Sequence, residues 1–201
     1  MRLGVFGGTF DPVHVGHLIL AEQCREQASL DQVLFVPALL PPHKQQQPLT
    51  PFAQRVEMLS LALSGNPAFR IDELEKDRTG PSFTVDTMTE LQARHRDAEL
   101  CFIIGSDSLH DLPKWYEPRR ILQLAELLVV ERDGFATWSA DELRGALQLA
   151  DDFPLRYRPI FMPLITLASR DIRRRIAEGK TVRYMIPRAV EAYIADRGFY
   201  R

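Results

Sequence analysis

The residues best suited to chemistry lie near the N-terminus, in the segment from Gly7 to His17, which reads GGTFDPVHVGH. The segment follows a short apolar run and leads into a stretch with helical spacing, so we expect a strand-to-helix turn. On a helix His14 and His17, three residues apart, share one face. The start of a helix favours an anion, and glycine lets a ligand approach the backbone closely. We therefore expect a phosphate site rather than two histidines that only cap or pack the helix.

Two other interpretations of nearby motifs are weaker. A metal site is disfavoured because no third ligand of suitable spacing lies near the two histidines. Gly179-Lys180-Thr181 resembles the end of a P-loop, but the first glycine of that motif would fall on Arg174, and the segment does not follow a strand. The glycines of the first strand and its turn do not have the spacing of a dinucleotide fingerprint.

The elements that position the first segment are predicted by hydrophobic spacing. Short apolar runs predict strands at 3–6, 33–36, 69–71, 100–104, 127–130 and 160–162. Helices are predicted at 14–27 and 54–64, after an N-cap at Ser82, after an N-cap at Ser169, and from Pro187 to just before Gly198. The proline-rich stretch 37–51 is predicted as a loop.

This alternation of strands and helices predicts an α/β fold with a doubly wound, mainly parallel sheet covered by helices on both faces. Ligands of such sheets bind at the carboxyl ends of the strands. The loops after Phe6, Val36, Ile104 and Val130 are therefore the expected site.

Composition limits the class of protein. The 201 residues are 45% hydrophobic and 26% charged, as in globular domains, and the net charge of -2 argues against a general nucleic-acid binder. We find no apolar run long enough for a bilayer and no signal segment. Cys24 and Cys101 lie in apolar stretches, so we expect reduced core thiols. These observations predict a soluble, cytoplasmic protein with no membrane partner.

Four arginines lie between Ser169 and Arg175, at the start of a predicted helix. Cations there oppose the helix dipole by roughly 0.3–1 kcal/mol each, and a bound polyphosphate would remove that conflict. Asp107 follows the strand at 100–104, where it suits either a ligand contact or a helix N-terminus. Trp115 and Tyr116 are interpreted as a rigid, partly exposed loop on which a flat ring can stack, with core aromatics as the alternative.

The pattern of glycines, Phe10, Pro12 and the two histidines resembles the nucleotidylyltransferase superfamily. Within it the chain resembles the bacterial nicotinate-nucleotide adenylyltransferases, on segments 41–44, 81–84, 105–108, 113–117, 169–173 and 197–201. The resemblance implies a Rossmann-like fold, a single domain over 1–201 and a C-terminal helical segment. It also implies transfer of AMP from ATP to nicotinate mononucleotide, which gives deamido-NAD and pyrophosphate in NAD biosynthesis, with Mg²⁺ bound to the ATP.

Residue roles follow from the same resemblance. It implies catalytic roles for His14, His17, Lys44 and Arg173. It implies ATP contacts by Gly7, Gly8, Thr9, Phe10, His17, Gly105, Asp107, Arg132, Ser169 and Arg173. It implies mononucleotide contacts by His43, Lys44, Ser82, Thr84, Val85, Asp107, Trp115 and Tyr116. The helix start departs from the family pattern at Ala168 and Arg170, and keeps it at Ser169, Ile172 and Arg173.

Other functions remain open at this point. The nearest is an adenylyltransferase that accepts nicotinamide mononucleotide, or both mononucleotides. A relative that makes dephospho-coenzyme A would be shorter and would not explain Trp115 and Tyr116. A non-catalytic nucleotide sensor of the same fold belongs to a different class. The presence of both histidines, Lys44 and Arg173 favours an enzyme.

Overall fold

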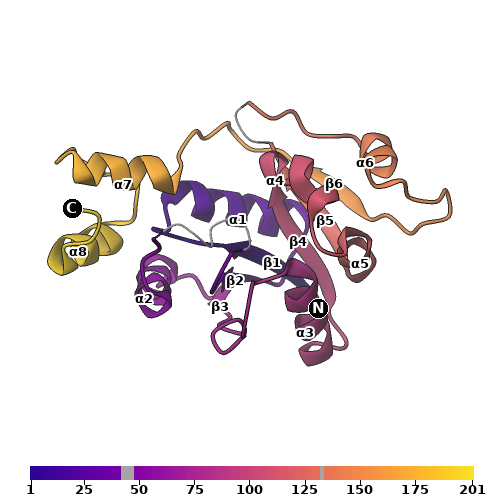
Figure 1. The fold of residues 1–201 in the computed structure, drawn as a ribbon, viewed down its shortest axis with the longest axis horizontal. Helices are drawn as coiled ribbons and strands as arrows, with labels where there is room; N and C mark the ends of the chain where they lie inside the picture. The colour runs from indigo at the N-terminus through magenta and orange to yellow at the C-terminus, as the bar shows by residue number, and fades with distance from the viewer. Residues whose placement is uncertain (42–47, 132–133) are drawn as a thin grey trace.

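The computed structural model describes residues 1–41, 48–131 and 134–201, and within these ranges six strands form one sheet (Figure 1). The strands are β1 (Arg2–Gly8), β2 (Gln32–Pro37), β3 (Phe69–Ile71), β4 (Glu99–Gly105), β5 (Ala125–Val130) and β6 (Tyr157–Ile160). Their order is β3-β2-β1-β4-β5-β6, and each neighbouring pair is parallel. The predicted parallel sheet is confirmed.

Helices cover both faces of this sheet; Figure 1 shows α1 on one side and α3 on the other. The α-helices are α1 (Val15–Gln27), α2 (Phe52–Leu63), α3 (Thr84–Arg94), α4 (Ser106–Asp111), α5 (Pro118–Leu124), α6 (Ala140–Leu147), α7 (Ser169–Ala177) and α8 (Arg188–Arg197), and η2 (Leu112–Lys114) is a 3₁₀-helix. One core contains side chains of α1, α2, α7 and α8, and the other contains side chains of α3 to α6. Within the described ranges, no helix has the length and apolarity to span a membrane.

The strands divide their side chains between the two cores because neighbouring residues point to opposite faces. In β4, Leu100, Phe102 and Ile104 lie in one core, and Cys101 and Ile103 lie in the other. A strand buried on both faces reads as a continuous apolar run, which is why 100–104 was recognisable as a central strand. It pairs with β1 on one side and β5 on the other.

The strand order reverses between β1 and β4. The chain places β2 and β3 on one side of β1, then returns to β4 on its other side and continues outward to β5 and β6. The loops that leave the carboxyl ends of β1 and β4 therefore diverge, which makes this edge the expected ligand crevice of a doubly wound sheet. The loop after β1 carries the segment with the two histidines.

The predicted boundaries of the last strand and of α3 are wrong. The last strand ends at Ile160 instead of beginning there, because Ile160 pairs with Val130, the final residue of β5. Phe161 beyond it is 77% exposed. Ser82 does not cap α3, whose N-cap is Phe83. The Ser82 hydroxyl instead accepts a hydrogen bond from the backbone N–H of Leu40, and the Ser82 N–H donates to the Leu40 carbonyl.

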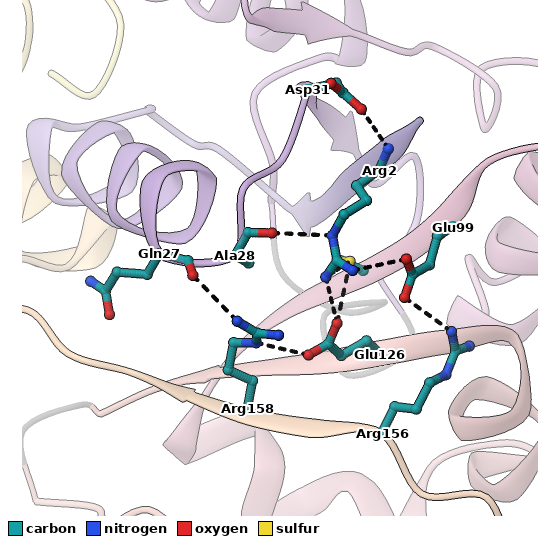
Figure 2. A network of polar contacts seen from close by, with 9 residues as sticks. Arg2, Gln27, Ala28, Asp31, Glu99, Glu126, Arg156 and Arg158 are labelled. Atoms are coloured by element: carbon teal, nitrogen blue, oxygen red, sulfur yellow. Dashed lines mark hydrogen bonds and ion pairs between the residues drawn. The ribbon is translucent and has the colours of Figure 1, made fainter.

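Charged residues link four strands at the amino end of the sheet, opposite the crevice (Figure 2). Arg2 of β1 lies 2.8 Å from the Glu99 carboxylate of β4 and 2.6 Å from the Glu126 carboxylate of β5. Arg158 of β6 contacts the other oxygen of Glu126 at 2.9 Å. The network satisfies the nearly buried Glu126 and ties the strands together, so its role is structural.

Cys24 and Cys101 are buried and free, as predicted for core thiols. Burial raises the pKa of Cys24 to about 12 and that of Cys101 to about 11, so both thiols stay protonated at neutral pH.

We expect Glu126→Gln to lower the unfolding free energy by about 1–2 kcal/mol at pH 7, because two charge-assisted hydrogen bonds lose their acceptor charge. Burial opposes ionisation of Glu126, but Arg158 and Arg2 outweigh it and lower its pKa. A lowered folded pKa contributes stability above the unfolded pKa of about 4.3, and this is lost as pH falls through the folded value.

Urea unfolding at pH 7 and at pH 3 measures both effects. The difference between wild type and variant should shrink at the lower pH. Glu22→Gln is the control, since Glu22 pairs with Arg25 within one partly exposed helix turn and links no separate elements through that pair, and we expect at most about 0.5 kcal/mol. An equal loss in the two variants would contradict the structural role of the network.

Candidate active site

The loop from Thr9 to His14 joins β1 to α1, and the two glycines that end β1 just before it differ in their surroundings. A Cβ at Gly7 would meet nothing within 4 Å, so a ligand can approach the backbone there. A Cβ at Gly8 would lie 2.8 Å from the Phe10 ring, so glycine is needed for that ring to fold back onto the strand. Phe10 is buried at a φ of 49°. Any contact of Phe10 with ATP must therefore come from its backbone.

The two histidines meet at the start of α1, where His14 is the N-cap and His17 lies one turn later. Their rings are stacked, with centroids 3.6 Å apart and planes 21° from parallel. His14 is buried, whereas His17 is partly exposed and its ring meets Phe10 edge-on at 5.2 Å. The spacing in the sequence thus brings the rings together, although His14 precedes the first helical residue.

A backbone contact orients the His17 ring. The N–H of His14 donates to His17 Nδ1 at 3.2 Å. Because a backbone N–H can only donate, Nδ1 is the acceptor, and the neutral ring carries its proton on Nε2. His17 therefore presents an N–H donor on its far side, which is the group that a phosphate oxygen requires.

Gly16 makes room for the stacked pair. A Cβ at this position would lie 3.0 Å from Nδ1 and 3.1 Å from Cε1 of His14. Few real Cβ atoms approach a neighbour so closely, so a larger residue would displace the His14 ring. The glycine between the two histidines thus serves the packing of His14.

Three carbonyl groups of the loop are bound by side chains of distant helices. Arg55 of α2 donates to the Thr9 carbonyl at 2.8 Å. Arg173 and Ser169 of α7 donate to the carbonyls of Asp11 and Pro12 at 2.6 and 2.9 Å. Occupied carbonyls cannot turn their partial negative charge toward an anion, so the loop is suited to phosphate.

The start of α7 differs from its prediction. Ser169 is the first helical residue, and Ala168, which has no side-chain cap, is the N-cap. The predicted N-cap role of Ser169 is wrong because its hydroxyl reaches the loop instead of its own helix. Among the arginines, Arg173 contacts the loop, whereas Arg174 pairs with Asp171 at the surface and Arg175 donates to the Thr181 carbonyl.

The carboxyl end of β4 contributes Gly105 and Asp107. Gly105 is the N-cap of α4, and Asp107 lies in the first turn of that helix with a partly exposed side chain. An acid there is stabilised by the helix dipole, which is the structural alternative raised by the sequence. Its expected contacts with ATP and the mononucleotide remain predictions.

Five of the residues expected to contact the mononucleotide lie on two neighbouring segments: Ser82, Thr84, Val85, Trp115 and Tyr116. Thr84 and Val85 are the first two residues of α3, where backbone N–H groups have no partner within the helix. Tyr116 is 54% exposed, and its ring lies 5.0 Å from that of Phe83. Trp115 is only partly exposed and packs edge-on against Phe102 at 6.1 Å. Ser82 is buried and bonded to Leu40, so its side chain is engaged within the protein.

Three expected site residues, His43, Lys44 and Arg132, lie outside the described residues. Three residues in or beside the loop were not predicted as site residues: Asp11, Arg55 and Tyr200. Of these, Arg55 could have been recognised from the sequence of α2, because it shares a helix face with Met58 and Leu59, which are buried. A charged residue at a core-facing position indicates a buried polar contact.

Comparison with known proteins identifies the family. Residues 5–175 match the model of the cytidylyltransferase-like family. The chain belongs to this family. Among its relatives, a probable nicotinate-nucleotide adenylyltransferase of Thermomicrobium roseum is 51% identical, over 100% of this chain and 92% of that protein. The nicotinate-nucleotide adenylyltransferase of Bacillus subtilis is 39% identical, over 99% of this chain and 98% of that protein.

Solved structures agree on the fold. The nicotinic acid mononucleotide adenylyltransferase of Plasmodium falciparum complexed with NaAD superposes with a TM-score of 0.81 at 18% identity, covering 99% of this chain and 97% of that one. The same enzyme complexed with APC gives a TM-score of 0.80. This likeness confirms the Rossmann-like α/β fold expected for a cytidylyltransferase-like protein.

The packing of His14 on Gly16 yields a testable prediction for this family member. Gly16→Ala should weaken ATP binding about tenfold, because displacement of the His14 ring disturbs the stacked pair. The unfolding free energy should change little, since alanine gains up to about 1 kcal/mol of helix propensity that offsets the crowding.

Calorimetric titration with ATP and thermal unfolding measure the two effects. Gly145→Ala in α6 is the matched control, because a Cβ there would meet nothing within 4 Å. That variant should gain stability and bind ATP normally. Wild-type affinity in Gly16→Ala would show that the stacked pair does not contribute to binding.

Proposed function

We propose that the protein transfers AMP from ATP to nicotinate mononucleotide, forming deamido-NAD and pyrophosphate. The stacked pair of His14 and His17 at the carboxyl end of β1 carries this proposal, since it presents a donor where the fold binds phosphates. Full-length relatives named nicotinate-nucleotide adenylyltransferase support the choice of reaction.

The chemistry requires alignment and charge neutralisation more than proton transfer. A phosphate oxygen of the mononucleotide, already anionic at neutral pH, attacks the α-phosphorus of ATP. The bond from that phosphorus to the bridging oxygen breaks, and pyrophosphate leaves with both electrons. No general base is needed, so catalysis depends on donors fixed around the reacting phosphorus.

The described residues suggest how these donors are supplied. His17 Nε2–H would donate to a phosphate oxygen, while its Nδ1 remains held by the His14 backbone. The guanidinium of Arg173 has five N–H donors, and one of them already binds the Asp11 carbonyl. The remaining donors would bind the triphosphate and balance its charge.

Magnesium is proposed to arrive with ATP. Within the described ranges, no three His, Cys, Asp or Glu side chains are grouped so that they could hold a metal. The loop carboxylate of Asp11 is buried and accepts hydrogen bonds from Tyr200 and Thr50. The phosphate oxygens of ATP would therefore be the main ligands, and the bound ion would neutralise the leaving pyrophosphate.

The choice of mononucleotide is proposed to depend on backbone donors. The carboxylate of nicotinate only accepts hydrogen bonds, and the first-turn N–H groups at Thr84 and Val85 only donate. The nearest arginines in sequence are engaged elsewhere. Arg78 binds Thr87 and Glu90, and Arg119 binds the carbonyl at the end of α6. Charge pairing with these arginines is thus not the basis of selectivity in our proposal.

We further propose that residues 1–201 form a single cytoplasmic domain. One hydrophobic core combines Leu20 of α1 and Leu59 of α2 with Ile172 of α7 and Ile194 of α8, so the C-terminal helices share the core of the sheet. The free thiols in this interior suit a reducing compartment.

Pyrophosphate release from ATP, measured with each mononucleotide in the presence of magnesium, tests the proposal. We expect kcat/KM for nicotinate mononucleotide to exceed that for the nicotinamide form at least about a hundredfold, because a carboxamide NH₂ would face a donor and leave it unpaired. Comparable rates would identify a dual-specificity or nicotinamide enzyme. ATP binding without turnover would identify a nucleotide sensor.

The arginines of α7 provide a second test. Arg173→Ala should lower kcat/KM for ATP about a hundredfold, as expected for loss of a donor to the reacting phosphates. Arg175→Ala is the matched control. Arg175 lies on the same helix and, like Arg173, donates a hydrogen bond to one backbone carbonyl, that of Thr181. Steady-state kinetics with varied ATP measures both. Equal losses would mean that general positive charge, rather than a specific contact of Arg173, matters.

A further inference from the structure

Arg55 is the most deeply buried charged side chain beside the loop, with an exposed fraction of 1%. It lies on α2, to which no predicted site residue belongs. Its guanidinium donates to three backbone carbonyls from three segments: to Thr9 at 2.8 Å, to Thr50 at 2.9 Å and to Leu39 at 3.5 Å. One rigid, planar group thus fixes the end of β1 relative to the segments after β2 and before α2.

Asp11 supplies the opposite charge within the same interior. Its carboxylate is 2% exposed and accepts hydrogen bonds from the Tyr200 hydroxyl at 2.6 Å and from the Thr50 N–H at 3.2 Å. The Thr50 hydroxyl in turn donates to the Tyr200 oxygen at 3.2 Å. Burial lowers the pKa of Arg55, and the charge of Asp11 partly opposes this effect. The buried Asp11 carboxylate is tolerated because Tyr200 and Thr50 donate to it and the positive charge of Arg55 acts on it through the same interior.

These contacts act on the backbone that must meet ATP. The Thr9 carbonyl is held by Arg55, the Asp11 side chain anchors the middle of the loop, and Arg173 and Ser169 hold the carbonyls of Asp11 and Pro12. Displacement of a binding loop by about 1 Å can reduce catalysis a hundredfold. A contact that never touches substrate can therefore control the rate.

We propose that Asp11, Thr50, Arg55 and Tyr200 form a positioning cluster. The cluster fixes the conformation of the nucleotide-binding loop, Thr9 to His14. Its effect on rate rests on the proposed adenylyl transfer, whereas its effect on the loop does not. The cluster gives Tyr200, 189 residues from Asp11 in the sequence, a role at the site, because its hydroxyl donates to the Asp11 carboxylate.

Tyr200→Phe is the decisive variant, since it removes one hydroxyl and keeps the ring. We expect amide hydrogen exchange in peptides spanning residues 7–17 to become at least about fivefold faster, because the loop loses an anchor. We expect kcat to fall about tenfold, with a smaller change in the KM for ATP. Thr50→Val, which removes only the hydroxyl contact to Tyr200, should change both quantities in the same direction and less.

Tyr193→Phe is the matched control. Tyr193 lies on α8 and also donates its hydroxyl to a carboxylate, that of Glu57 on α2, but at the surface. This variant should show neither faster loop exchange nor reduced kcat at a temperature well below its Tm. Loop exchange and kcat in Tyr200→Phe that match those of Tyr193→Phe would overturn the proposal.

The two readouts separate this proposal from the proposed function. If the wild-type protein catalyses no adenylyl transfer, the proposed function fails, and loop exchange in the same variants still decides whether the cluster positions the loop. If Tyr200→Phe does not fold, Thr50→Val decides: wild-type exchange in that variant rejects the cluster, and faster exchange supports it.

Discussion

A loop that binds polyphosphate must turn its own carbonyl oxygens away, because they carry partial negative charge that repels the ligand. In this protein, side chains from other elements bind the carbonyl groups of the loop after β1. Its carbonyls at Thr9, Asp11 and Pro12 accept hydrogen bonds from side chains of α2 and α7. Arg55 of α2 and Ser169 and Arg173 of α7 thus meet this requirement from two separate helices.

Much of the fold and the centre of the site were predictable from local patterns. The run from Leu100 to Ile104 predicted a central strand because burial on both faces leaves no polar position. The glycine and histidine pattern predicted a strand-to-helix turn, and the three-residue spacing of His14 and His17 is short enough to bring their rings into contact. Both predictions depend only on residues close to each other in the sequence.

The predictions failed where a distant partner decided the outcome. Ser82 and Ser169 have the residue type of an N-cap, yet one bonds to Leu40 and the other to Pro12, and in both cases a tertiary contact replaced the local one. Arg55 was missed for the same reason, since its acceptors lie on separate loops. Local propensity cannot show whether such a side chain will cap its own helix or bond to a distant residue, because only the complete fold brings the distant partner close.

The hydrogen bond between Asp11 and Tyr200 spans 189 residues, almost the length of the chain. A ribosome makes Asp11 189 residues before Tyr200, so a nascent chain can pair β1 with β2 long before the loop after β1 gains this donor. Ligands stabilise only the states that they bind. In our proposal, ATP therefore protects finished molecules against unfolding and gives little protection to chains still attached to the ribosome.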